Sequence, residues 1–166
     1  IERGDPARVL VAKSPRAQDP SQPLEFDFVR SVALGGMFRL DLGISSPNPY
    51  GFLGQVWIAA DPSSGRTAGN LYLLCSLDPP GPDPMDVLFA RSIDGGSTWS
   101  APVRVNKDAG TAWQWFGTMS VAPNGRIDVV WNDTRNTGRA DRSQLYYAQS
   151  SDGGVTWSVN VALSFA

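Results

Sequence analysis

One eight-residue phrase occurs twice in the chain and constrains its fold more than any other feature. Residues 92–99 and 150–157 both read Ser-x-Asp-Gly-Gly-x-Thr-Trp, and their aspartates, Asp94 and Asp152, lie 58 positions apart. Six identities at one fixed spacing indicate an internal repeat, and a long-period repeat is typical of stacked copies of one supersecondary unit. The phrase therefore predicts a repeated architecture before the chemistry of any side chain is considered.

Each copy of the phrase lies within the same order of short apolar runs. Every run has the length of a strand, is rich in Val, Leu, Ile and aromatic residues, and is bounded by turn-forming residues. The predicted strands are residues 55–60, 70–76, 85–91 and 99–105 in the first copy and 116–121, 126–132, 144–149 and 157–163 in the second. Ile127, Val129 and Trp131 recur at every second position, which is the period of a strand. No segment shows a convincing helical period. We predict that each copy is a four-stranded antiparallel meander in which the phrase forms the hairpin between the third and fourth strands.

The front of the chain carries part of an earlier unit. Residues 9–14, Val-Leu-Val-Ala-Lys-Ser, resemble residues 87–92, Val-Leu-Phe-Ala-Arg-Ser, nearly position by position. Residues 9–14 and 28–30 are therefore predicted to be the third and fourth strands of a unit whose hairpin, residues 15–25, has lost the phrase. An unassigned crossing over residues 35–52 leads to the first complete copy.

Four-stranded units in series predict an all-β fold, a β-propeller of which about two and a half blades are present. The half blade is assigned to residues 1–34, and the complete blades to residues 53–106 and 113–164. Because two and a half blades do not close a ring, we expect either a portion of a longer polypeptide or copies that assemble around one axis. The chain begins with Ile1 and shows no signal segment there, so we expect a processed or excised portion.

Composition excludes several classes of function. The chain has no histidine, so neither a Ser-His-Asp mechanism nor a histidine zinc site is available. A formal net charge of −2, without clustered Lys and Arg, argues against a nucleic-acid partner. No apolar run approaches the ~20 residues that a membrane-spanning helix needs. Cys75 is the single cysteine, which excludes an internal disulfide, and its apolar neighbours predict a buried, inert thiol.

The repeated phrase resembles the Asp-box, or BNR repeat, of sialidase-like β-propellers. Two complete copies and one degenerate copy cover most of the chain. The resemblance implies the propeller fold and an extracellular, cell-surface or periplasmic location. The motif recurs in sialidases, other glycoside hydrolases, sorting receptors and uncharacterised secreted proteins, so it does not specify an activity.

The residues of the phrase have the chemistry of a turn. The aspartates are expected to accept N–H groups within their own turns, the glycines to permit positive φ, and the threonines to add a hydroxyl bond. The tryptophans are expected to cover the base of each hairpin. The structural residues predicted in this way are Ser92, Asp94, Gly96, Thr98, Trp99, Ser150, Asp152, Gly154, Thr156 and Trp157.

The candidate site is the loop of residues 131–142, which holds two aspartates and three arginines. In sialidases, the blade that carries the catalytic acid/base has an arginine after its second strand and an aspartate about six residues later. By this resemblance Arg135 would bind substrate and Asp141 would be the acid/base, provided that its surroundings raise its pKa. Asp133 is a further candidate for substrate binding. The alternative is a solvated turn with weak local Arg–Asp pairs.

The chain also departs from the sialidase pattern. Sialidases precede this loop with a Phe/Tyr-Arg-Ile-Pro phrase, whose arginine holds the carboxylate of the substrate as a bidentate clamp. The equivalent residues 115–118 read Trp-Phe-Gly-Thr and contain no arginine.

Two further sets of residues have two interpretations each. Trp113 and Trp115 would stack on a sugar ring if they are exposed, and would pack between blades if they are buried. Asp78, Asp83 and Asp86 lie in a proline-rich loop, where they would offer oxygen ligands to Ca²⁺ or belong to a rigid connection. Their spacing is not that of an EF-hand, and we predict neither a metal site nor a cofactor.

Three functions remain open. We favour a non-catalytic Asp-box propeller that serves as a binding or scaffold module of a secreted or surface protein, with a carbohydrate or protein ligand. The second is a portion of a sialidase-like glycoside hydrolase that acts on sialylated or related glycans. The third is a self-assembling structural subunit, in which further copies complete the ring. None of the three involves nucleic acid or a membrane span.

Overall fold

The computed structural model describes residues 8–39, 46–49 and 51–164, and these residues form three antiparallel sheets without a helix. The first meander consists of β3 (Trp57–Ala60), β4 (Leu71–Leu77), β5 (Asp86–Ser92) and β6 (Val103–Arg104). The second meander consists of β7 (Gln114–Val121), β8 (Ile127–Asp133), β9 (Gln144–Ser150) and β10 (Val161–Ala162). Strands that are neighbours in sequence are neighbours in each sheet. The predicted all-β fold of four-stranded antiparallel units is thus confirmed.

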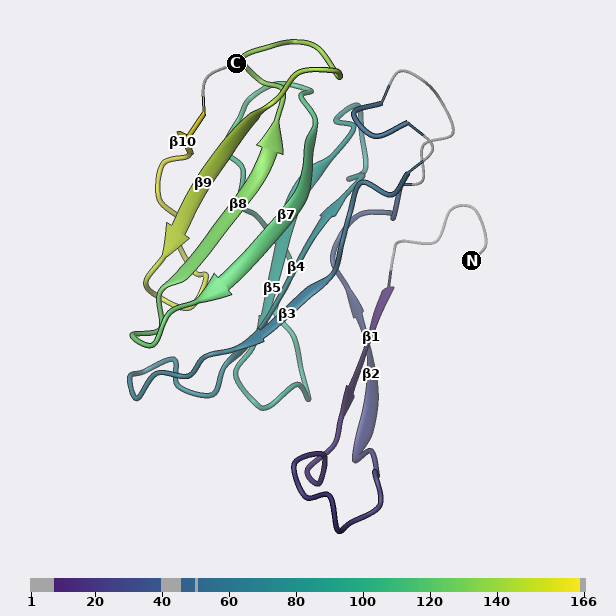
Figure 1. Cartoon of the computed structure of the whole chain (residues 1–166), viewed down its shortest axis with the longest axis vertical. Coiled ribbons are helices and arrows are strands. Elements are labelled where there is room, and N and C mark those ends of the chain that lie inside the picture. The colour runs from purple at the N-terminus through teal and green to yellow at the C-terminus, as the bar shows by residue number, and fades with distance from the viewer. Residues whose placement is uncertain (1–7, 40–45, 50, 165–166) are drawn as a thin grey trace.

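A separate hairpin precedes the two meanders. It pairs β1 (Arg8–Lys13) with β2 (Phe28–Ala33), and Val11 lies opposite Arg30 in the register. Figure 1 shows this hairpin beside the first meander, on the side away from the second. The hairpin therefore lies where the predicted half unit would precede the first complete unit.

The two Asp-Gly-Gly corners, residues 92–99 and 150–157, share the hydrogen bonds between their aspartate and their threonine. Asp94 Oδ1 accepts the N–H of Thr98 (2.9 Å) and its Oδ2 accepts the Thr98 hydroxyl (2.6 Å). Asp152 makes the same two contacts with Thr156, at the same distances. All four glycines of the corners have positive φ, between 69° and 91°, which a residue without Cβ adopts at little cost.

The fourth strand of each meander is shorter than the sequence predicts. Serine hydroxyls replace part of the strand ladder: Ser100 Oγ accepts the N–H of Arg91 (3.1 Å), and Ser158 Oγ accepts the N–H of Gln149 (3.0 Å). Both serines directly follow the tryptophan of the phrase, so the repeated sequence extends one residue further than the eight-residue match. Side-chain pairing of this kind keeps the fourth strand attached while only two residues retain the regular ladder.

The main core lies between the two meanders. Its members come from both sheets and are Tyr72, Leu74, Val87, Phe89, Val105, Met119, Ile127, Val129, Trp131, Tyr146, Ala148 and Trp157. At its centre the Phe89 ring meets Trp157 edge to face at 5.1 Å and lies 5.6 Å from Tyr72. Aromatic pairs in such arrangements add to the stabilisation that burial alone provides.

A second core lies on the opposite face of the first meander. Val11 and Val32 of the hairpin pack there against Leu73, Cys75 and Ala90. The strand β4 is consequently covered on both faces, which explains why residues 71–75 form a continuous apolar run. In contrast, β8 alternates strictly between buried and half-buried residues.

A β-bulge interrupts β7 between Trp115 and Thr118. Within it, Phe116 has a φ of 54°, an uncommon value for a residue with a side chain. The Phe116 N–H donates to Leu53 O (3.0 Å), and the Gly117 N–H donates to the Ser76 hydroxyl (3.0 Å). The bulge thus diverts the backbone of β7 toward the first meander.

The two corners provide a matched test of the core. A methyl group added at Gly154 would overlap the buried ring of Phe89, whereas at Gly96 the nearest atom is Leu71 Cδ1 at 3.4 Å. Since both glycines have positive φ, Gly96→Ala should cost about 1 kcal/mol for the backbone alone. Gly154→Ala should cost more than about 2 kcal/mol because the ring has no room to move. Chemical denaturation of both variants measures this difference, and equal costs would contradict the packing described here.

Candidate functional site

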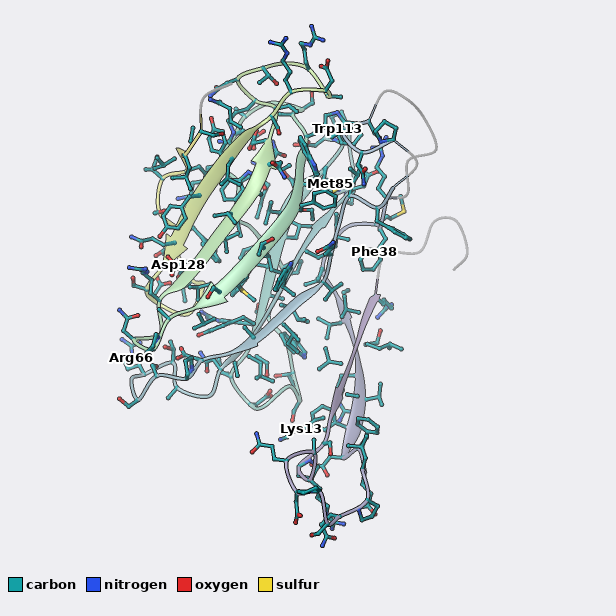
Figure 2. The ribbon with its side chains drawn as sticks, in the orientation of Figure 1. Lys13, Phe38, Arg66, Met85, Trp113 and Asp128 are labelled. Atoms are coloured by element: carbon teal, nitrogen blue, oxygen red, sulfur yellow. The ribbon has the colours of Figure 1, made fainter. Side chains whose placement is uncertain are left out.

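The candidate site lies at the end of the two meanders opposite to the Asp-Gly-Gly corners. Figure 2 shows Trp113 and Met85 at this end, far from Arg66 and Asp128 at the other. The loop that precedes β7 and the loop between β8 and β9 meet there around an open pocket of about 610 Å³. The pocket is lined by residues 108–113, 134–136 and 138–140. It therefore lies on the loop after a second strand, where the sequence placed its candidates.

Asp133 lies beneath the pocket, and its side chain is fully buried. Its Oδ2 accepts hydrogen bonds from Trp131 Nε1–H (2.8 Å) and Arg135 Nη2–H (2.6 Å), and its Oδ1 accepts the N–H of Arg135 (2.8 Å). Charge-assisted bonds of this kind are among the strongest in proteins. Asp133 thus lies under the pocket wall, and both of its carboxylate oxygens already accept hydrogen bonds.

Arg135 lines the pocket but is held from several sides. Its guanidinium lies over the ring of Tyr146, 4.3 Å from the centroid, and Tyr146 in turn stacks on Trp131 at 6.0 Å. Its Nη2 is 3.7 Å from Asp108 Oδ1 as well as bonded to Asp133. The side chain is 17% exposed, so a ligand would meet a guanidinium whose position is already determined by the protein.

Asp141 is the most exposed of the candidates. It forms a bidentate pair with Arg139 at 2.8 and 2.6 Å, and both side chains are more than half exposed. The hydrogen bond from Arg139 lowers the pKa of Asp141. A catalytic acid/base at this position requires a raised pKa. The surroundings of Asp141 shift its pKa in the opposite direction.

The two tryptophan candidates have different surroundings. Trp113 is half-buried and lines the pocket, and the Arg39 guanidinium lies 4.6 Å from its ring centroid. Trp115 is buried and packs with Leu53 and Met85. Only Trp113 is therefore accessible from the pocket.

Sequence reasoning missed two polar residues at the pocket. Asp108 follows the last strand of the first meander and reaches the second through Arg135 and Gln114, whose Nε2 lies 3.3 Å from Asp108 Oδ2. Asn136 Nδ2 lies 2.7 Å from both Gln144 Oε1 and the Tyr146 hydroxyl. The signal that would have found Asp108 is topological, because the end of one meander lies beside the second-strand loop of the next.

Cys75 and the aspartates of the proline-rich loop do not line the pocket. Within the described ranges, no group of three or more His, Cys, Asp or Glu side chains is arranged to hold a metal ion, the acidic loop that contains Asp78 included. Cys75 is fully buried, and burial raises its pKa to about 12, which keeps the thiol protonated. No helix long and apolar enough to cross a membrane occurs in the part of the chain that the structure describes.

Two aspartates of the same loop test how the pocket is supported. Asp133→Asn removes the charge that holds Arg135 and should lower the free energy of unfolding by about 3 kcal/mol, because the guanidinium loses its buried partner. Asp141→Asn is the matched control and should leave this free energy unchanged within error, since its pair with Arg139 is exposed to solvent. Urea denaturation of both variants measures the two effects, and a large loss for Asp141→Asn would contradict this division.

No protein-family model matches the chain, and no curated protein matches its sequence. Among solved structures, the chain is similar to the intramolecular trans-sialidase from Ruminococcus gnavus, solved in complex with oseltamivir carboxylate. The two are 23% identical, with a TM-score of 0.46, over 68% of this chain and 20% of that chain. The chain thus spans about a fifth of the length of that structure.

Proposed function

We propose that the chain is part of a non-catalytic Asp-box β-propeller, a binding or scaffold module of a secreted or surface protein. The main support for the proposal is the burial, pairing and pKa of the two carboxylates in the 131–142 loop. Asp133 is buried and fully occupied by its partners, and Asp141 is an exposed carboxylate with a lowered pKa. Asp133 therefore supports the pocket wall, Asp141 forms an exposed ion pair, and neither has the environment of a general acid.

The pocket offers the groups that bind a polar ligand with an apolar face. Trp113 provides an aromatic surface, and the backbone and side chains of Thr134, Asn136 and Arg139 provide polar atoms around it. A sugar ring presents hydroxyls at its rim and C–H groups on its face, so an oligosaccharide fits this combination. We therefore propose a carbohydrate ligand ahead of a protein ligand.

The alternative function is a portion of a sialidase-like glycoside hydrolase. The spacing of Arg135 and Asp141 supports it, and an arginine at the pocket would suit an anionic glycan. The two functions differ in one measurable respect, because a hydrolase turns a sialoside over and a binding module does not.

Completion of the ring is also a proposal. On the hairpin, Leu10 and Val29 are 71% and 55% exposed and face away from the first meander, and Leu145 of β9 is 37% exposed. Exposed apolar sheet faces are typical of surfaces that pack against another sheet. We propose that further blades of the same polypeptide cover them. A self-assembling subunit is the alternative, and light scattering that finds a monomer would contradict it.

Binding and turnover are best measured on the full protein that carries this chain. We expect no hydrolysis of a fluorogenic sialoside, and retention of at least one member of an array of defined oligosaccharides. Trp113→Ala and Arg139→Ala should each weaken that retention at least tenfold, because they remove the aromatic surface and an exposed cation. Asp141→Asn is the discriminating variant: sialoside turnover that it abolishes would establish the hydrolase instead. Unchanged retention after both pocket substitutions would show that the ligand binds elsewhere.

A further inference from the structure

A buried group of carboxylates lies beside the pocket, at the end of the first meander. Asn106 holds two of them, since its Nδ2 donates to Asp86 Oδ1 (2.6 Å) and to Asp108 Oδ1 (2.7 Å). Its Oδ1 accepts the N–H of Val87 (2.8 Å), so the amide itself is anchored to β5. Asp83 completes the group from the loop that leads into β5. We call Asp83, Asp86 and Asp108 the carboxylate triad.

The triad has too little positive charge around it. Arg104 Nη1 lies 3.4 Å from Asp86 Oδ1 and 3.7 Å from Asp83 Oδ2. Arg135 lies 3.7 Å from Asp108 but makes its closest contact, 2.6 Å, with Asp133. Four carboxylates thus share two guanidinium groups, which leaves two negative charges uncompensated if every carboxylate is ionised. Such an excess in a poorly hydrated environment is costly.

The surroundings of Asp83 disfavour its charged form. Its Oδ1 is buried and has no hydrogen-bond partner, and the side chain as a whole is 15% exposed. Burial, followed by the negative charges of Asp86 and Asp108, raises the pKa of Asp83 to about 6. A protonated oxygen at this position removes one of the excess charges and becomes a donor.

The other groups around Asp83 do not remove the excess. The Met85 N–H and Arg104 act to lower its pKa but do not outweigh burial. Arg39, which lies in the crossing after β2, pairs with Asp78 at 3.4 Å, and its Nη1 lies 3.3 Å from Pro84 O. Burial raises the pKa of Asp86 as well, so Asp83 and Asp86 both favour an added proton.

We propose that the carboxylate triad is a proton-operated latch, in which one proton taken up in mildly acidic medium fastens the end of the first meander to the loop that lines the pocket. Asp108 belongs to the triad and to the pocket wall, so a proton on Asp83 weakens the charge repulsion that reaches the wall through Asp108. The latch concerns the folded protein itself and does not depend on what the pocket binds.

The sign of the effect follows from linkage. Asp83 has a higher pKa in the folded protein than its ordinary value of 3.8, so the folded state binds more protons between about pH 4 and pH 6. Stability from this group is therefore fully present below about pH 4 and is lost as the pH rises through 6. Within that window, the unfolding equilibrium constant should fall by up to about tenfold for each unit of acidification.

The test compares wild type with Asp83→Asn and Asp141→Asn in the full protein. Denaturant unfolding between pH 7.5 and 4.5 should show wild type and Asp141→Asn gaining stability on acidification. Asp83→Asn should be more stable than wild type at pH 7.5 and should lack most of this gain, because the amide is neutral throughout. A pH dependence of Asp83→Asn that equals that of wild type would overturn the proposal.

A second measurement uses only the wild-type protein and so does not depend on whether a variant folds. The carboxyl ¹³C resonance of Asp83 in the wild-type protein reports its protonation directly. We expect a titration midpoint of about 6, and a midpoint near the ordinary value of 3.8 would overturn the latch. A midpoint near 6 for Asp86 in place of Asp83 would likewise contradict the assignment of the proton to Asp83.

Discussion

The contact between Phe89 and Trp157 is the interaction on which the arrangement of the two meanders depends. Trp157 ends the second Asp-Gly-Gly corner, and Phe89 lies in the middle of β5, so their rings join a turn of one sheet to the face of the other. Gly154 allows this approach because it has no side chain at the point where the corner meets the ring. In the sequence the second corner looks like a purely local turn. In the structure it is also a contact between the two meanders. Trp99, its counterpart in the first corner, instead packs at the edge of the core beneath the hairpin, and its Nε1 donates to Gly96 O (3.2 Å).

The repeat allowed most of the fold to be predicted from the sequence, because a repeated hairpin defines the order of the strands around it. The strands β4, β5, β8 and β9 begin and end close to the predicted residues. The fourth strands are the exception, since the hydroxyls of Ser100 and Ser158 take over ladder bonds that no apolar pattern reveals. Residues of the candidate loop line the pocket, but what each residue does there depends on its burial. Asp133 and Asp141 are the same residue type in the same loop, and only the structure shows that one is enclosed and the other solvated.

The two ends of the meanders are stabilised in different ways. The corner end combines short-range bonds within each turn with the packing of Trp157 on Phe89, whereas the pocket end relies on polar side chains that reach from one sheet to the other. Asp108, Gln114 and Arg135 form that connection, and the Arg135–Tyr146 stack extends it. Buried polar connections of this kind require every partner to be placed well, which explains why the pocket wall is built from groups that are already paired. It also explains how a single proton on a neighbouring carboxylate would affect the wall.

The bulge in β7 limits how this edge of the sheet can pair with a second copy of the chain. β7 is an edge strand of its sheet, and a straight edge strand is a template for pairing with a strand of another molecule. Between Trp115 and Thr118 the hydrogen-bond ladder is interrupted. There the backbone N–H groups of Phe116 and Gly117 donate to Leu53 O and the Ser76 hydroxyl of the same molecule. An intruding strand would find no continuous row of donors there. The unusual backbone of Phe116 thereby removes the straight edge that would favour pairing with a strand of another molecule.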